Sequence, residues 1–321
     1  MKNYQSPRAS NWKGRASGAS LYLHEKVALA DLQGLQGGGK SPTFALLGYA
    51  CDEGVKRNQG RPGAAGGPKA IRGMLGRLPN HLGSDVQVCD LGDIVCMDGQ
   101  MEAAQASLGE AVCQLLKKGV CPLVLGGGHD MAFGHYTGIR EYLGSGKRIG
   151  IVNFDAHFDL RSNTKGNHSG TPFYQIGTES GGRGEAFDYL CLGVRKDAND
   201  ATLYVTAESL GVHYIERDDF TIQELTSVQM GLLAFMDQVD VVYVTIDLDG
   251  FSSAFAPGVS APSPMGFFPD IVWEALKIIV DSGKLCSLDI AELNPEFDQD
   301  HQTARLAASL LHAVMHRWSL L

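Results

Sequence analysis

The sequence predicts an α/β fold in which helices cover both faces of a parallel β-sheet. Eight short segments are apolar or β-branched over three to six consecutive residues, as strands buried on both faces are. Segments with apolar residues at three- and four-residue spacing lie between many of them, which indicates that helices alternate with strands. The 321 residues show no repeat and no internal linker, so we expect one open sheet.

The expected elements follow a polar, glycine-rich lead-in over residues 1–42. Strands are expected at residues 43–50, 85–93, 121–128, 148–156, 188–194, 212–219, 240–249 and 284–293. The clearest helices are expected at residues 101–119, 221–238, 268–283 and 301–318. Basic residues in the last turn of the first helix, followed by Gly119, are typical of a helix C-terminus. Residues 43–321 are accordingly predicted to form a single domain.

The composition limits the kinds of partner. A net charge of −9 argues against nucleic acid or an anionic membrane surface, although a local group of basic residues can still bind a small anionic substrate. No apolar run approaches the roughly 18 residues that span a bilayer. The first 24 residues are basic, as in transit peptides, but contain no clear amphipathic helix. Seven scattered cysteines without a C-x-x-C pair predict reduced thiols in a cytoplasmic protein.

Polar motifs follow three of the strands at their carboxyl ends, where ligands bind in open α/β sheets. The motifs are "LVLGGGHD", "GIVNFDAHFD" and "VVYVTIDLDG". Their candidate ligand side chains are His129, Asp155, His157, Asp159, Asp247 and Asp249. Residues at positions i, i+2 and i+4 of an extended segment share one face, so Asp155, His157 and Asp159 are expected to point the same way.

Each motif alone has a simpler interpretation. An isolated D-x-D after a strand is usually a turn, and His129 by itself would more often be a hydrogen-bonded loop residue. The glycine run could form a phosphate-binding turn, but no Lys-Ser/Thr pair follows it. The sequence D-x-H-x-D after a buried strand favours a metal instead, because two uncompensated carboxylates would repel each other there.

Together the motifs supply four carboxylates and two imidazoles, which is more than one ion needs. Such an oxygen-rich set suits Mn²⁺ better than Zn²⁺, with Co²⁺, Fe²⁺ or Ni²⁺ as alternatives. Six ligands for two ions imply bridging carboxylates and ions about 3.5–4 Å apart. A pair of this kind lowers the pKa of a bridging water and supplies hydroxide at neutral pH, so the expected reaction is hydrolysis.

The motifs "GGGHD", "DAHFD", "TIDLDG" and "SLDIAELNPEFD" resemble, in order and approximate spacing, those of the ureohydrolases, the arginase and agmatinase family. The resemblance covers the chain from Phe44 onwards and implies a three-layer α/β/α arginase-like fold with a parallel sheet of about eight strands. It also implies two Mn²⁺ per subunit. The ligands of one ion would be His129, Asp155, Asp159 and Asp247. Those of the second would be Asp155, His157, Asp247 and Asp249, with Asp155 and Asp247 as bridges.

Several details resemble the formimidoylglutamases of this family more than the arginases. The glycine loop reads "GGGHD" where arginases and agmatinases usually have G-G-D-H-S, and Arg161 stands where arginases carry an asparagine. The segment "AFAPGVSAP" and elements similar to W-x-G-R and N-x-G-R-x-G-A are also present. The resemblance implies cleavage of N-formimidoyl-L-glutamate to L-glutamate and formamide, a step of histidine degradation, with the metal-bridging hydroxide attacking the formimidoyl carbon.

The resemblance also suggests which residues meet the substrate. Glu292 would bind the positively charged formimidoyl head, and Arg161 would pair with a carboxylate in two-point fashion. Asn58, in the glycine-rich loop after the first strand, is a candidate for the other carboxylate. The basic residues of the same loop are open as alternatives, namely Lys56, Arg57 and Arg61. His168 in "GNHSGTPF" would pass a proton to the leaving amine.

Plainer interpretations exist for two of these residues, a surface salt bridge for Arg161 and a helix N-terminal acid for Glu292. Other functions also stay open on the sequence. They are a urea-releasing arginase, agmatinase or guanidinobutyrase, a single-zinc deacetylase-like hydrolase of related fold, and a non-catalytic paralogue. The presence of all six ligands disfavours the last of them. A homo-oligomer is a further expectation, because members of the family are commonly trimers or hexamers.

Overall fold

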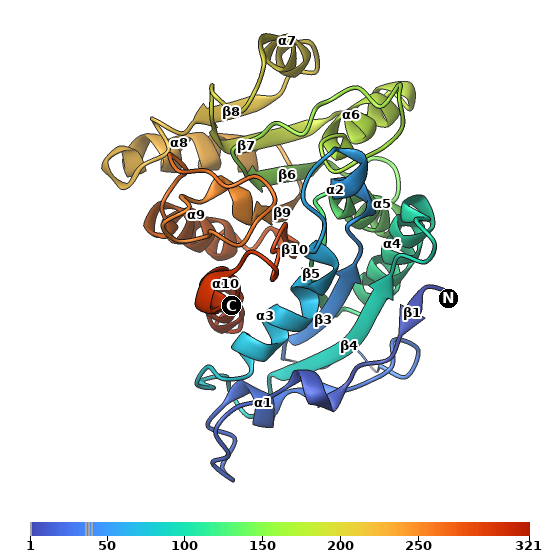
Figure 1. Ribbon diagram of the computed structural model, residues 1–321, viewed down its shortest axis with the longest axis vertical. Coiled ribbons are helices and arrows are strands. Elements are labelled where there is room, and N and C mark those ends of the chain that lie inside the picture. Colours follow the sequence, from blue (N-terminus) through green and yellow to red (C-terminus); the bar gives the residue numbers. More distant parts are fainter. Residues whose placement is uncertain (1, 36, 38, 40) are drawn as a thin grey trace.

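A single sheet lies between two layers of helices in the computed structural model of the chain (Figure 1). The structure describes residues 2–35, 37, 39 and 41–321. Positions 1, 36, 38 and 40 of the predicted lead-in lie outside the described residues. The three-layer α/β/α arrangement agrees with the predicted fold class.

The sheet contains all eight predicted strands and two short ones. Its strands are β1 (Tyr4–Gln5), β2 (Ala28–Leu29), β3 (Thr43–Ala50), β4 (Gln87–Val95), β5 (Cys121–Leu125), β6 (Ile149–Phe154), β7 (Asp188–Val194), β8 (His213–Glu216), β9 (Val241–Asp247) and β10 (Leu285–Ala291). The order is β1-β4-β3-β5-β10-β9-β6-β7-β8, and β2 also pairs with β4. Strands β3 to β10 pair in parallel, whereas β1 is antiparallel to β4. The strands β1 and β2 are only two residues long and were not predicted.

The helices divide between the two faces of the sheet. They are α1 (Leu23–Lys26), α2 (Glu53–Arg57), α3 (Gly67–Leu75), α4 (Met101–Lys117), α5 (Met131–Leu143), α6 (Pro172–Gly182), α7 (Ala201–Ser209), α8 (Leu225–Met236), α9 (Pro269–Asp281) and α10 (Gln302–Trp318). One face packs against α4, α5, α6 and α7, and the other against α3, α8, α9 and α10 (Figure 1). The four helices expected from periodicity are confirmed as α4, α8, α9 and α10.

Helix α5 illustrates why glycine-containing helices were harder to predict. Glycine lowers helix propensity, and α5 contains Gly134 and Gly138. A Cβ on Gly138 would lie 2.4 Å from the carbonyl oxygen of Gly109 in α4. The glycines are therefore needed for the close approach of the two helices, and packing stabilises a segment whose intrinsic preference is weak.

The N-terminal lead-in is tied to the sheet edge by a buried ion pair. Arg72 of α3 is fully buried and donates from Nε to Asp90 of β4 at 2.9 Å and from Nη1 to Asp93 at 2.7 Å. Trp12 of the lead-in donates its indole N–H to the other oxygen of Asp90 at 2.7 Å. The guanidinium and the two carboxylates thus compensate one another's charge, which offsets the free-energy cost of removing them from water. The boundary at residue 42 stays a prediction.

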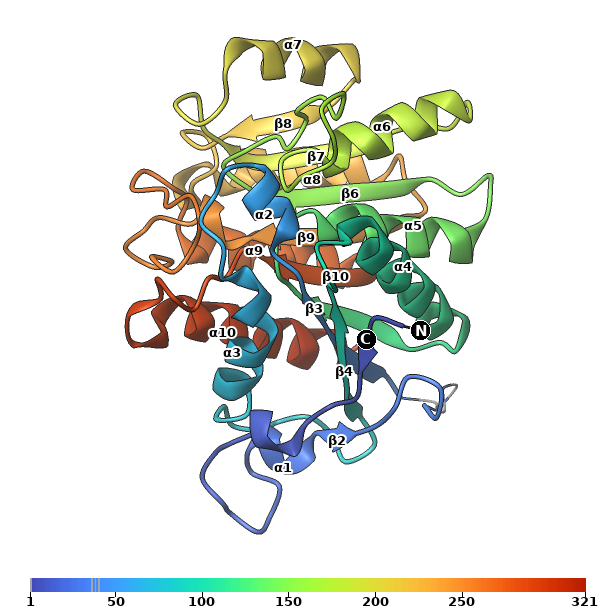
Figure 2. The same cartoon turned by 45° about the vertical axis from the view of Figure 1, so that its right-hand side comes forward.

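The carboxyl ends of β5, β10, β9 and β6 meet at one edge of the sheet because these strands are consecutive neighbours. Strand β3 ends on the same side, and the segment that follows it forms α2 at that edge (Figure 2). Within the described residues, none of the helices is both long enough and apolar enough to cross a membrane.

Candidate metal centre and active site

The six predicted ligand side chains come together at this edge of the sheet. Asp247 is the last residue of β9, Asp155 directly follows β6, and His129 lies in the loop between β5 and α5. Because β6 and β9 are paired, Asp155 and Asp247 emerge beside each other. The sheet order explains why residues more than a hundred positions apart in sequence form one group.

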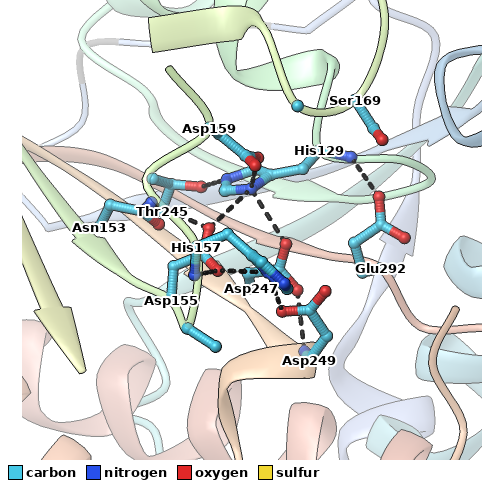
Figure 3. A network of polar contacts seen from close by, with 12 residues as sticks. His129, Asn153, Asp155, His157, Asp159, Ser169, Thr245, Asp247, Asp249 and Glu292 are labelled. Atoms are coloured by element: carbon cyan, nitrogen blue, oxygen red, sulfur yellow. Dashed lines mark hydrogen bonds and ion pairs between the residues drawn. The ribbon is translucent and has the colours of Figure 1, made fainter. Parts of the chain in front are cut away.

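His129 stands at the centre of the first set of ligands (Figure 3). Its Nδ1 lies 3.0 Å from an oxygen of Asp159, 3.0 Å from Asp247 and 3.3 Å from Asp155. The ligand atoms of these four residues lie within 4.8 Å of one another, and all four residues are buried. An ion could bind at the centre of this group.

A second set of ligands adjoins the first. His157 Nδ1 lies 3.4 Å from Asp155 and 3.3 Å from Asp249, and these three residues also offer ligand atoms within 4.8 Å of one another. Asp155 belongs to both sets and is therefore placed to bridge two ions. Asp247, the other predicted bridge, belongs to the first set alone by this distance criterion.

The backbone turns within both motifs instead of continuing as a strand. Strand β6 ends at Phe154, and Asp159 has φ 49°, in the left-handed region that L-residues rarely adopt. Asp155 accepts a hydrogen bond from the His157 N–H at 2.7 Å, as Asp247 does from the Asp249 N–H at 2.8 Å. The expectation that an extended segment aligns the three side chains of "DAHFD" is wrong. A loop brings them together.

A chain of buried hydrogen bonds sets the tautomer of His129. The hydroxyl of Thr245 donates to Asp289 at 2.5 Å, so its oxygen accepts the Nε2–H of His129 at 2.9 Å. Nδ1 is therefore the ring nitrogen that faces the carboxylates, and it offers its lone pair to a metal ion once its proton is lost. Among the described residues, Nδ1 of His129 is a buried polar atom without a hydrogen-bond partner, and so is Oδ1 of Asp249. Two orphaned donor atoms on metal-ligand side chains are what a metal site requires.

The electrostatics of the group also favour bound cations. Burial, together with repulsion from Asp249 and Asp155, raises the pKa of Asp247 well above its usual range. Burial raises the pKa of Asp249 to about 6. Burial opposes a charged ring at His129, yet the surrounding carboxylates still raise the pKa of this imidazole well above its usual value. The residues present therefore fit a cluster of hard divalent ions, which would offset the buried negative charge.

A cavity of about 310 Å³ opens directly onto the ligand cluster. Several predicted substrate residues line it, together with residues that were not singled out. Besides the metal ligands, its polar walls include Asn58, Arg61, Arg161, Ser169, Ser260 and Glu292. The candidate ligand cluster and several of the predicted substrate residues thus line one cavity.

Glu292 follows β10 and is buried, with φ 67°. Its Oε1 accepts the backbone N–H of His129 at 2.8 Å, and burial with the nearby Asp247 charge raises its pKa well above the usual range. The interpretation of Glu292 as a helix N-terminal acid is excluded, because no helix begins beside it in the described chain. Its carboxylate faces the cavity near the metal ligands (Figure 3).

The structure shows which of the basic residues after the first long strand can reach the substrate. Lys56 is exposed and pairs with Glu53 at 3.8 Å, and Arg57 pairs with Glu102 at 2.6 Å. Arg61 lines the cavity, with Nε and Nη2 donating to the carbonyl oxygens of Ser260 and Val259 and its guanidinium 3.8 Å from the centre of the Phe297 ring.

Arg161 differs from these in having no fixed partner. No hydrogen bond or ion pair engages its guanidinium within the described parts of the chain, and it lines the cavity. The alternative interpretation of Arg161 as a surface salt bridge is therefore not supported. An unpaired guanidinium on a cavity wall is available to a carboxylate ligand.

His168 does not line the cavity, whereas its neighbour Ser169 does. The Nδ1 of His168 accepts the Gly170 N–H at 3.1 Å, and burial lowers the pKa of the ring. The proton-shuttle role of His168 stays a prediction. Ser169 was missed because a serine in a glycine-rich loop carries no local signal of function, and only the three-dimensional course of the loop turns it towards the ligands.

Comparisons with known proteins agree with this geometry. The family model described as the arginase family matches residues 42–316. A formimidoylglutamase of Geobacillus thermodenitrificans is 43% identical over 321 residues, covering 98% of this chain and 97% of the relative. A formimidoylglutamase of Aeromonas hydrophila is 44% identical over 319 residues, covering 98% of this chain and all of the relative (100%).

Solved structures share the fold. The formimidoylglutamase of Bacillus subtilis has a TM-score of 0.83 at 22% identity, covering 96% of this chain and 95% of its own. The formiminoglutamase of Trypanosoma cruzi, solved with Mn²⁺, has a TM-score of 0.78 at 24% identity, covering 90% and 98%. The match to the family model and the identities of more than 40% with full-length relatives establish that the chain belongs to the arginase family.

Proposed function

We propose that the chain hydrolyses N-formimidoyl-L-glutamate to L-glutamate and formamide. The relatives with more than 40% identity over nearly their whole length are named formimidoylglutamases. One observation carries the proposal: the same cavity holds the Glu292 carboxylate, beside the ligand cluster, and the Arg161 guanidinium, which has no partner in the described chain. A molecule with a cationic head and an anionic body complements these two groups.

The ligand cluster fits two Mn²⁺ ions, held by His129 with Asp155, Asp159 and Asp247, and by Asp155, His157 and Asp249. A related formiminoglutamase was solved with Mn²⁺. When bound, such a pair supplies hydroxide at neutral pH by lowering the pKa of water. Asp155 is the side chain shared between the two positions.

The residues of the chain orient the substrate for this attack. Glu292 has one oxygen tied to the His129 N–H, so its other oxygen can accept a hydrogen bond from the amidinium head. Arg161 would hold a carboxylate of the glutamate portion, with Asn58 and Arg61 as further polar groups of the same wall. The reaction adds water across the bond between the formimidoyl carbon and the glutamate nitrogen. The oxygen stays in formamide, and a proton goes to the amine.

An assay of products with three substrates tests the proposal. Purified chain with added Mn²⁺ should release glutamate and formamide from formimidoylglutamate and little urea from arginine or agmatine. Urea from arginine at a comparable rate would identify a urea-releasing enzyme instead. One tightly bound Zn²⁺ per chain by elemental analysis would favour the deacetylase-like alternative.

We also propose that the chain is cytoplasmic, since all seven cysteines are free thiols, and that it forms a homo-oligomer. Light scattering would determine the oligomeric state.

A further inference from the structure

We propose that Ser169, positioned by Asn58, donates a hydrogen bond to the substrate nitrogen that leaves with glutamate. The inference rests on the proposed function and assigns a role in it to a residue that the sequence did not indicate. Ser169 is buried, lines the cavity, and lies on the side of the ligand cluster where Glu292 is found (Figure 3).

The contacts of Ser169 leave its hydroxyl proton free. Asn58 Nδ2 donates to Ser169 Oγ at 3.1 Å, so the serine oxygen acts as the acceptor in this pair. The backbone N–H of Ser169 donates to the carbonyl oxygen of Gly54 at 3.1 Å, which holds the residue against the start of α2. No acceptor for the Ser169 hydroxyl proton is found within the described residues. The proton can therefore be directed at a ligand in the cavity.

The cavity wall offers a polar group for each part of the substrate. Glu292 lies beside the metal ligands, and Asn58 links Ser169 to the region of Arg161. A Cβ on Gly170 would lie 2.7 Å from Arg161 Nη1 and 3.3 Å from Asn58 Nδ2, so these groups gather around the residue next to Ser169. In formimidoylglutamate the nitrogen joins the formimidoyl head to the carbon that bears the α-carboxylate. We assign Ser169 to this nitrogen because it lies on the side of the ligand cluster where Glu292 is found (Figure 3), and because Asn58 and Arg161 gather at the next residue.

The electronic structure of the amidine predicts when this hydrogen bond acts. In the intact substrate, the nitrogen lone pair is delocalised into the formimidoyl group and is a poor acceptor. Addition of water to the carbon removes the delocalisation, and the lone pair becomes basic. The bond from carbon to this nitrogen then breaks as the new carbon–oxygen double bond forms, and the hydroxyl proton of the intermediate ends on the nitrogen. The Ser169 hydroxyl stabilises this developing lone pair by donating a hydrogen bond to it, and the serine keeps its proton.

An interaction made mainly in the transition state changes kcat and leaves KM nearly constant. Ser169→Ala should therefore lower kcat about tenfold to a hundredfold, the effect of removing one hydrogen-bond partner. Its KM for formimidoylglutamate and its inhibition constant for L-glutamate should stay within about twofold of the unmodified chain, since ground-state contacts are retained. Ser180→Ala is the matched control, because Ser180 is a buried serine of α6 that does not line the cavity.

Asn58→Ala provides a second variant that keeps the serine. Without the amide, the hydroxyl of Ser169 loses its fixed orientation, and kcat should again fall, by less than in Ser169→Ala. This variant also keeps the proposal testable if Ser169→Ala does not fold, which thermal unfolding would reveal.

The outcomes separate this inference from the proposed function. Absence of formamide release by the unmodified chain would overturn the proposed function and this inference with it. Formamide release by the unmodified chain together with an unchanged kcat in Ser169→Ala would overturn the inference alone. A raised KM with unchanged kcat in Ser169→Ala would also overturn it, because that result identifies a ground-state binding contact.

Discussion

Glu292 accepts a hydrogen bond from the backbone nitrogen of His129 at 2.8 Å, and this contact joins the end of β10 to the first residue of the ligand cluster. One oxygen of the carboxylate is fixed by the chain, and the other is left for a ligand. The contact fixes a buried carboxyl group next to the candidate metal ligands. The group proposed to bind the cationic head is thereby attached to a residue proposed to bind the metal.

Replacing Glu292 by Gln tests this recognition. The amide keeps the acceptor for the His129 N–H but removes the charge that pairs with the amidinium, so kcat/KM should fall about a hundredfold or more. Glu296→Gln is the matched control, because Glu296 is exposed four residues further along and does not line this cavity. Steady-state kinetics decide the prediction, and equal kcat/KM in the two variants would contradict it.

Replacing Arg161 by Ala should mainly impair binding of the glutamate portion. Loss of a charge-assisted pair predicts a rise in KM of about 10- to 100-fold and a parallel weakening of inhibition by L-glutamate. Lys56→Ala serves as the control, since Lys56 is exposed and paired with Glu53. If KM is unchanged in Arg161→Ala, another residue binds the carboxylate, and Arg61 is the next candidate.

Asp155 is the ligand shared by the two sets, so Asp155→Asn should weaken metal retention and abolish turnover. After dialysis, elemental analysis should find less Mn²⁺ in Asp155→Asn than in the unmodified chain. Added Mn²⁺ should not raise the melting temperature of the variant. Asp237→Asn, at an exposed position of the surface, should behave as the unmodified chain does. Full activity with full metal content in Asp155→Asn would refute its bridging position.

Metal-free and metal-loaded protein should respond to pH in opposite directions. Burial raises the pKa of Asp249 to about 6 and that of Asp130 to about 7. A carboxyl group with a raised folded-state pKa binds its proton more tightly when folded, so its contribution to stability grows as pH falls from about 8 towards 5. Mn²⁺ binding requires deprotonated ligands and weakens over the same range.

The measurement for this prediction is the melting temperature in EDTA and in excess Mn²⁺ at several pH values. The difference in melting temperature between excess Mn²⁺ and EDTA should become smaller as pH falls. A difference in melting temperature that is constant or widens on acidification would show that protonation of Asp249 is not linked to metal binding.

The buried ion pair at the sheet edge predicts a large effect on stability. Asp90→Asn leaves the fully buried Arg72 guanidinium without its main countercharge and should lower the free energy of unfolding by about 3–5 kcal/mol. Asp281→Asn removes the exposed pair with Arg317 and should cost no more than about 1 kcal/mol. Urea unfolding compares the two variants, and equal losses of unfolding free energy would show that the buried pair contributes no more than the exposed one.

The sequence was sufficient for the eight long strands and for placing the six candidate ligands at one edge of the sheet, because both depend on local pattern. Polar residues directly after buried strands, such as Asp155 and Asp247, must lie at the sheet edge once the strands pair in parallel. The direction of the loop after Asp155 could not be predicted, since the left-handed conformation of Asp159 depends on its surroundings. The same limit separates His168 from Ser169, whose placement depends on contacts with Gly54 and Asn58 that are distant in sequence.

In the proposed reaction, the ligand cluster directs water to the formimidoyl carbon, and the bond from this carbon to the glutamate nitrogen breaks. Formimidoylglutamate labelled with ¹³C at the formimidoyl carbon, followed by NMR with the Mn²⁺-loaded chain, tests this directly, because the amidine carbon has two bonds to nitrogen. The label should appear in formamide while unlabelled L-glutamate accumulates in equal amount. Label in N-formylglutamate with release of ammonia, or no turnover with Mn²⁺ bound, would contradict it.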